Sequence, residues 1–112
     1  MRVRGLMLAI GLLAVPAAAQ DTVHQHGGSA DAMQDAMQQM QNGMDMPATG
    51  DVDIDFARMM IPHHQGAIDM AKAELGSGKD PQLRQLAEEI IAAQEKEILF
   101  LKEWLARREV QP

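Results

Sequence analysis

The large apolar residues of this chain recur at helical spacing in three stretches separated by short breaks. The first stretch runs from Ala30 to about Met44, and its large apolar residues are all methionines. They are Met33, Met37, Met40 and Met44, whose spacing of 4, 3 and 4 residues places them on one narrow helical stripe. The pattern predicts a short methionine-rich helix with Ser29 as its cap. Glycine and proline then interrupt the pattern, so residues 45–50 are expected to form a loop.

Two longer helices are expected after this loop. The first is predicted from Val52 to Leu75, with Asp51 as its cap and the Gly76-Ser77-Gly78 run as its end. The second starts at Asp80-Pro81, a favourable pair for a cap and first turn, and extends to about Ala106. Helices of these lengths measure roughly 36 and 39 Å, and a link of only four or five residues joins them. The sequence therefore predicts an antiparallel helical hairpin.

The hairpin core is expected where the apolar stripes of the two long helices meet. On the first long helix the stripe contains Ile54, Ile61, Ile68 and Leu75. On the second it contains Leu83, Leu86, Ala87, Ile90, Ile91, Ile98, Leu101, Trp104 and Leu105. Gln94 interrupts this second stripe, and a buried amide needs hydrogen-bond partners. It is either a satisfied core amide or a partner that orients His64, and both interpretations stay open.

The first 19 residues have the pattern of a cleaved secretory signal. Arg2 and Arg4 precede an apolar run over residues 5–15, and Ala17-Ala18-Ala19 supplies the small residues of a cleavage site. The apolar run is about a dozen residues long, whereas a membrane-spanning helix needs about 20. We therefore expect an exported protein, periplasmic or secreted. Its expected segments are a signal peptide (1–19), a His/Met-rich arm with a short helix (20–50) and a helical hairpin domain (51–108).

Composition narrows the classes of partner. Removing residues 1–19 leaves 112 − 19 = 93 residues with 8 cationic and 16 acidic side chains, a net charge of −8. This acidity argues against nucleic acid and against anionic membrane surfaces as partners. The chain has no cysteine, so disulfides are excluded, and a domain this small then gains stability from metal or from oligomerisation. No membrane association is expected once the signal is removed.

The candidate chemistry lies in the run Met59-Met60-Ile61-Pro62-His63-His64. The chain holds ten methionines and no cysteine, and it places two thioethers and two imidazoles within six residues of one predicted helix. A thioether is a soft, neutral donor that favours Cu(I) or Ag(I), whereas zinc favours cysteine, histidine or carboxylate. The run therefore predicts a Cu(I) site, with Ag(I) as a second ion of the same type.

Helical geometry predicts which donors act together. With Met59 at zero, Met70 falls at about 20°, His63 at 40°, Met60 at 100° and His64 at 140°. Met59, His63 and Met70 are the expected inner ligands, and Met60 and His64 are additional or second-site ligands. A bend at Pro62 is expected to aim the four residues beside it at one point. The methionine-rich helix is expected to dock across this line, adding the donors Met33, Met37, Met40 and Met44.

Residues 55–71 and 86–98, with Trp104-Leu105, resemble a known family. The specific string is Met-Ile-Pro-His-His-Gln-Gly at residues 60–66. It resembles the family catalogued as domain of unknown function 305 (DUF305), which includes the CopM-like periplasmic copper-binding proteins. The resemblance covers about Val52 to Leu105. It implies an all-α, ferritin-like helical bundle, export, and binding of copper or silver through Met59, Met60, His63, His64 and Met70.

Two other classes of function are weighed against metal binding. A structural hairpin that dimerises into a bundle would use the methionines for packing, and the stripe from Met33 to Met44 taken alone favours that interpretation. A ferritin-like di-metal enzyme would need Glu-x-x-His pairs, and the chain has none. We therefore expect a non-catalytic protein for metal tolerance, storage or hand-over. Its expected partners are the metal ion, a second copy in a homodimer and a copper-handling protein.

Overall fold

The structure is a computed structural model, and it describes residues 28–109. Over these residues the chain forms three helices and no strand: α1 (Ser29–Met44), α2 (Val52–Ser77) and α3 (Pro81–Glu109). The predicted all-α class is therefore confirmed for the described part of the chain. The predicted signal peptide and residues 20–27 of the predicted arm lie outside it. No helix within residues 28–109 is both long and apolar enough to cross a membrane.

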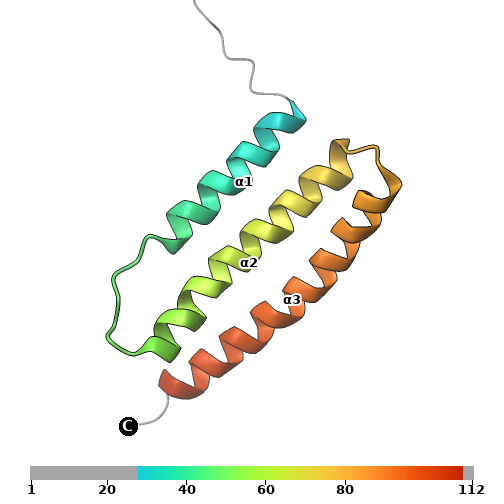
Figure 1. Ribbon diagram of the computed structural model, residues 1–112. Coiled ribbons are helices and arrows are strands. Elements are labelled where there is room, and N and C mark those ends of the chain that lie inside the picture. Colours follow the sequence, from blue (N-terminus) through green and yellow to red (C-terminus); the bar gives the residue numbers. More distant parts are fainter. Residues whose placement is uncertain (1–27, 110–112) are drawn as a thin grey trace, which may run out of the picture.

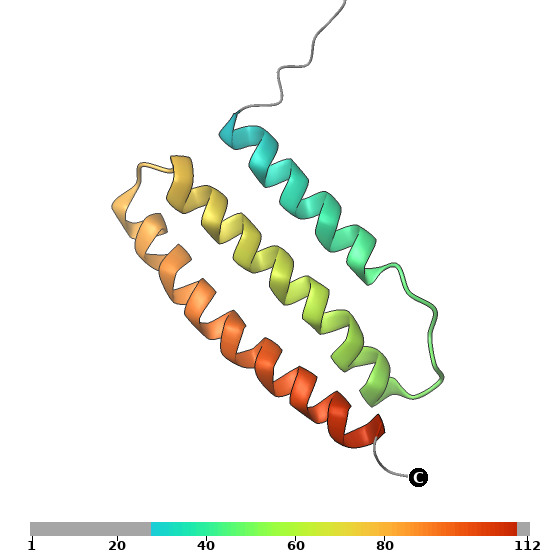
Figure 2. The same ribbon diagram turned by 180° about the vertical axis from the view of Figure 1, so that it is seen from behind.

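The three helices lie side by side in one layer, with α2 in the middle (Figures 1 and 2). Both α1 and α3 contact α2, and within residues 28–109 they do not contact each other. Protein domains normally consist of at least two packed layers, because one layer can bury only the edges at which its elements touch. The described chain therefore leaves the broad faces of this layer uncovered.

Aspartate caps start the two long helices, as predicted. The Asp51 carboxylate accepts hydrogen bonds of 2.9 and 3.1 Å from two backbone N–H groups in the first turn of α2. The Asp80 carboxylate accepts bonds of 2.9 and 3.0 Å from two such groups in α3. The prediction for α1 was wrong by one residue, since Gly28 is the cap and Ser29 is already helical. The Gly28 N–H donates to the Asp31 carboxylate at 3.2 Å, which secures the turn.

Glycines set the close approach between α1 and α2. A Cβ atom built on Gly66 of α2 would lie only 2.6 Å from the Cβ atom of Met40 in α1. A Cβ atom built on Gly43 of α1 would lie 2.6 Å from the Cβ atom of Pro62 in α2. Neither space admits a methyl group, so these contacts fix both the position and the register of α1 along α2. They also show that α1 packs over Pro62 and Gly66.

The α2–α3 hairpin turns over residues 78–80, a link shorter than predicted. Arg84 of α3 closes this end of the hairpin by donating to the backbone carbonyls of Leu75 and Gly78, at 2.8 and 3.0 Å. These carbonyls would otherwise lack partners at the end of α2.

The hairpin core is smaller than the sequence predicts. The buried residues of the hairpin are Ala57, Ile68, Ala71, Ala87, Ile98 and Leu101, while Gly66 of α2 is buried against α1. Leu83 and Leu86 were expected in the core and are instead 54% and 49% exposed. The reason is geometric, because a helix that packs against one neighbour buries a narrow stripe, and these leucines lie beside that stripe.

Candidate metal centre

The four donors around Pro62 form two Met–His pairs. Met60 and His64 are four residues apart on α2, as are Met59 and His63, and residues at this spacing are neighbours on a helix surface. We call Met60 and His64 the groove pair and Met59 and His63 the surface pair. α2 continues through Pro62 without a break in the helix.

The groove pair lies between α2 and α3. Met60 and His64 line a pocket together with Phe56, Glu97, Phe100 and Leu101. The surrounding residues are largely apolar, so the imidazole and the thioether meet few competing polar groups there. Both donors are half-buried by the side chains of α3.

His64 is held by a carboxylate from α3. Its Nε2 atom contacts the Oε2 atom of Glu97, and the His64 side chain is only 12% exposed. Its other ring nitrogen, Nδ1, is buried and has no hydrogen-bond partner. In a neutral imidazole, a carboxylate that accepts the Nε2 proton leaves a lone pair on Nδ1. Metal-bound histidines commonly have this arrangement, with one nitrogen on a carboxylate and the other on the ion. His64 therefore fits a metal ligand.

The surface pair points to a different side of α2. Met59 is 39% exposed, and His63 is exposed as well. The rings of His63 and His64 have centroids 6.1 Å apart and planes inclined by 60°. The expected bend at Pro62 does not gather all four donors at one point in this structure, because α3 holds the groove pair while the surface pair faces outward.

Met70 lies away from the surface pair. It lines a second pocket of the hairpin with apolar residues of α3, among them Leu83, Leu86 and Ile90. It is seven residues beyond His63, or about 10 Å along the helix axis. Met70 and His63 project from the same side of α2, but they lie at different positions along the helix axis and are not neighbours. The structure therefore does not bring Met70 together with Met59 and His63.

The methionines of α1 lie beside α2, not across the surface pair as expected. Met40 packs against Gly66, and Met33 lines a groove with Ala73 and Glu74 of α2. Met37 is 37% exposed, and Met44 is half-buried. The expected docking across Met59, His63 and Met70 was wrong, because the glycine contacts draw α1 toward Pro62 and Gly66.

Sequence reasoning missed Glu97 as the partner of His64. Gln94 was the residue considered for that role, yet its buried Oε1 atom has no hydrogen-bond partner, so neither interpretation of Gln94 is confirmed. Glu97 follows Gln94 by three residues, which places it nearly one turn further along the same side of α3. This spacing, combined with the antiparallel pairing of α2 and α3, was the sequence signal that could have identified Glu97. Within residues 28–109 no three or more His, Cys, Asp or Glu side chains form a group that could hold an ion.

Comparison with known proteins identifies similar sequences without an assigned activity. A family model described as "Domain of unknown function (DUF305)" matches residues 8–105. A curated relative, "Uncharacterized protein L153" of Acanthamoeba polyphaga mimivirus, is 41% identical over 59 residues. The aligned region covers 53% of this chain and 39% of the viral protein.

Proposed function

Since the chain belongs to the DUF305 family, whose description assigns no activity, we propose its function from the site: it binds Cu(I), and Ag(I) in the same way, through methionine and histidine. The observation that carries the proposal is the state of His64. One of its ring nitrogens is held by Glu97, and the other is buried without a partner in a pocket that Met60 also lines. A buried polar atom without a partner is costly, and an ion would satisfy it.

The donor set selects the type of ion. A thioether sulfur and an imidazole nitrogen in an apolar groove suit a soft monovalent cation. We propose Met60 and His64 as one ligand pair and Met59 and His63 as a second. The methionines Met33, Met37, Met40, Met44 and Met70 are further candidate ligands, of which Met40 also packs against Gly66.

The biological role follows from the ion and from the predicted export. We propose that the protein acts in the periplasm or outside the cell, where thioethers remain available while free thiols oxidise. It holds the ion for tolerance, storage or transfer to a copper-handling partner, and it catalyses no reaction. We further propose that the α2–α3 hairpin is one half of a ferritin-like bundle.

An oxygen-free titration tests this function. The purified chain is titrated with Cu(I) against a chromophoric Cu(I) chelator, and bound metal is counted by native mass spectrometry. We expect stoichiometric uptake that decreases when Met60→Leu and His64→Asn are combined. Leucine has about the same apolar volume as methionine and lacks the thioether sulfur.

Met46→Leu is the matched control. Met46 lies in the loop after α1, outside both Met–His pairs, so the same change there should leave uptake unchanged. A chain that takes up no Cu(I) would contradict the proposal and favour a purely structural bundle.

A further inference from the structure

One face of the helical layer carries exposed apolar residues from all three helices. On α2, with Met59 at zero, Val52, Phe56 and His63 lie at about 20°, 60° and 40°. α1 packs near 320°, over Pro62 and Gly66, and α3 packs near 140°, over His64 and Ala71. Val52, Phe56 and His63 therefore point out of the layer, in a direction between α1 and α3.

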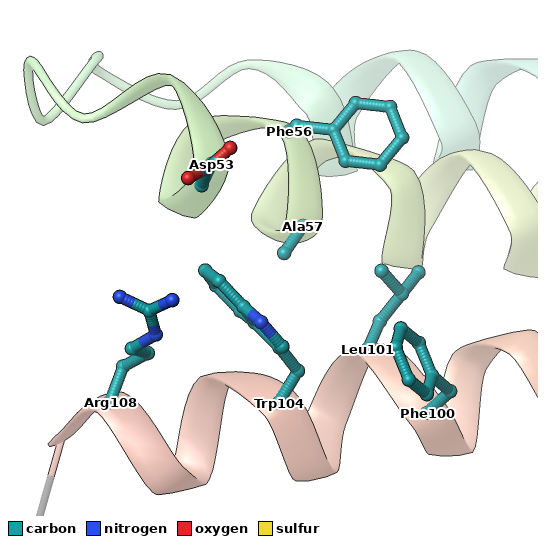
Figure 3. Close-up of a pocket in the computed structure, with 7 residues that line it drawn as sticks. All are labelled: Asp53, Phe56, Ala57, Phe100, Leu101, Trp104 and Arg108. Atoms are coloured by element: carbon teal, nitrogen blue, oxygen red, sulfur yellow. The ribbon is translucent and has the colours of Figure 1, made fainter.

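Both neighbouring helices add apolar residues to this side. Glu74 lines the groove with Met33 of α1 and also the groove with Leu86 of α3, so both grooves open on one side of α2. Figure 3 shows the rings of Phe56, Phe100 and Trp104 around a separate pocket between α2 and α3, toward the other end of the hairpin. We call this side the Met59 face, and its exposed residues are Met37, Val52, Phe56, Met59, His63, Leu83, Leu86 and Phe100.

On the opposite side of the layer, α2 presents polar residues. Arg58, Gln65 and Lys72 of α2 fall at about 260°, 240° and 220°, directly away from the Met59 face. The exposed large apolar residues within residues 28–109 lie on the Met59 face, except for Leu99, which is 59% exposed. The layer is therefore amphipathic as a whole, which is the property of one half of a two-layer structure.

We propose that a second copy of this chain packs on the Met59 face and completes the surface pair into a shared metal site. The size of the face supports this occupant. Helices of 26, 29 and 16 residues at axis spacings of 8–10 Å make a face of about 1,000 Å², and a stable interface needs about 800 Å² per partner. A second copy brings a matching set of exposed apolar side chains.

Symmetry then places His63. In a face-to-face pair the two-fold axis lies in the plane between the two layers. A residue at the centre of the face lies on this axis and meets its own copy in the second chain. α2 is the middle helix, and His63 stands near the middle of its span, Val52–Ser77. The two copies of His63 therefore face each other, with a Met59 one turn away in each. Two imidazoles and two thioethers complete a soft site, so this part of the inference rests on the proposed function.

A single introduced cysteine tests the arrangement without metal. The chain has no cysteine, so His63→Cys creates one thiol per chain. Facing helices in contact bring such Cα atoms to roughly 4–6 Å, within disulfide range. We expect mild oxidation to convert most of the protein into a disulfide-linked dimer. Gln65→Cys is the control, because this exposed residue lies about 200° around the same helix and should give little dimer. No cross-link from His63→Cys, or equal cross-linking at both positions, would overturn the proposal.

Paired leucine substitutions test the face as a whole. Leu86→Asp, on the Met59 face, should convert the dimer seen by analytical ultracentrifugation into a monomer, whereas Leu99→Asp should leave it intact. Circular dichroism checks that both variants keep their helices. An unmodified chain that sediments as a monomer would overturn the proposal.

Metal uptake separates the two proposals. One Cu(I) lost per two chains on His63→Ala supports the shared site. A monomer that binds Cu(I) overturns the dimer and leaves the proposed function standing. An unmodified chain that sediments as a dimer and takes up no Cu(I) supports the packing and overturns the proposed function together with the shared site.

Discussion

At the scale of single residues, two adjacent histidines differ in what surrounds them. His64 is enclosed by α3, with one ring nitrogen on Glu97 and the other buried without a partner, whereas His63 is exposed. The sequence alone does not distinguish the surroundings of these two histidines. The difference arises because adjacent residues diverge by about 100° around a helix, so one neighbouring helix can cover only one of them.

The Glu97 carboxylate should tune the affinity of His64 for metal. Replacing Glu97 with Gln keeps the shape but removes the charge that orients the ring, and changes of this kind weaken metal binding about 10- to 100-fold. We expect a loss in this range in chelator competition with Cu(I). Glu95→Gln, an exposed residue of the same helix, is the control and should keep the original affinity. Equal affinities for the Glu97→Gln and unmodified chains would exclude a role for the carboxylate.

Asp55 should make the start of α2 sensitive to acid. The backbone N–H of Thr49 donates to its carboxylate at 2.9 Å, and the Thr49 hydroxyl donates at 2.7 Å. These bonds, the backbone one first, lower the pKa of Asp55 below its ordinary value of 3.8. A lowered pKa in the folded state gives stability that is present above pH 3.8 and is lost as the pH falls through the lowered value.

Asp55→Asn tests this link by urea unfolding across pH. The variant should be less stable than the unmodified chain at neutral pH, and the difference should shrink as the pH falls below 3.8. Asp53→Asn removes a charge from the same helical turn, with no bond to Thr49 in the described contacts, and should show a smaller effect. Identical pH profiles for the two variants would rule out the contribution of Thr49.

At the scale of helices, the α1–α2 contact depends on the space at Gly66. An alanine there favours the helix by about 0.5–1 kcal/mol through backbone entropy, but its methyl group would meet Met40 at 2.6 Å. Overpacking of this kind costs about 1–3 kcal/mol, so Gly66→Ala should destabilise the protein. Gly76→Ala, with nothing within 4 Å, is the matched control and should stabilise it. Denaturant unfolding measures the change in the free energy of unfolding for each variant. If both changes stabilise the protein, α1 does not pack at Gly66.

The sequence predicted where helices begin more reliably than what they contact. Asp51 and Asp80 start α2 and α3 as expected. A cap residue bonds to backbone N–H groups only two or three residues further along the chain, so local sequence is enough to identify it. The docking of α1 was predicted wrongly, since a methionine stripe shows which side of a helix is apolar but not which surface receives it. Gly43 and Gly66 carried the missing information, and their role is apparent only once the two helices are paired.

At the scale of the whole molecule, the single layer explains why partners matter for stability. The buried residues of the described helices are Gly66 and four alanines, with Ile68, Ile98 and Leu101 as the larger side chains. A core of this size contributes little apolar burial, and the chain has no cysteine to form disulfides. Whatever binds the folded state should therefore shift its unfolding measurably.

Metal should raise the melting temperature of the protein by mass action. An ion that binds only the folded chain adds about 2.7 kcal/mol of stability when free metal reaches 100 times the Kd. For a domain of this size that corresponds to a rise of roughly 10 °C or more in Tm. Far-UV circular dichroism in oxygen-free buffer measures the shift with Cu(I), and Ag(I) should act in the same direction. The chain with Met60→Leu and His64→Asn should lose much of the rise, because it keeps the helices and lacks the groove pair. Equal melting temperatures with and without metal in the unmodified chain would mean that the ion does not bind the folded state.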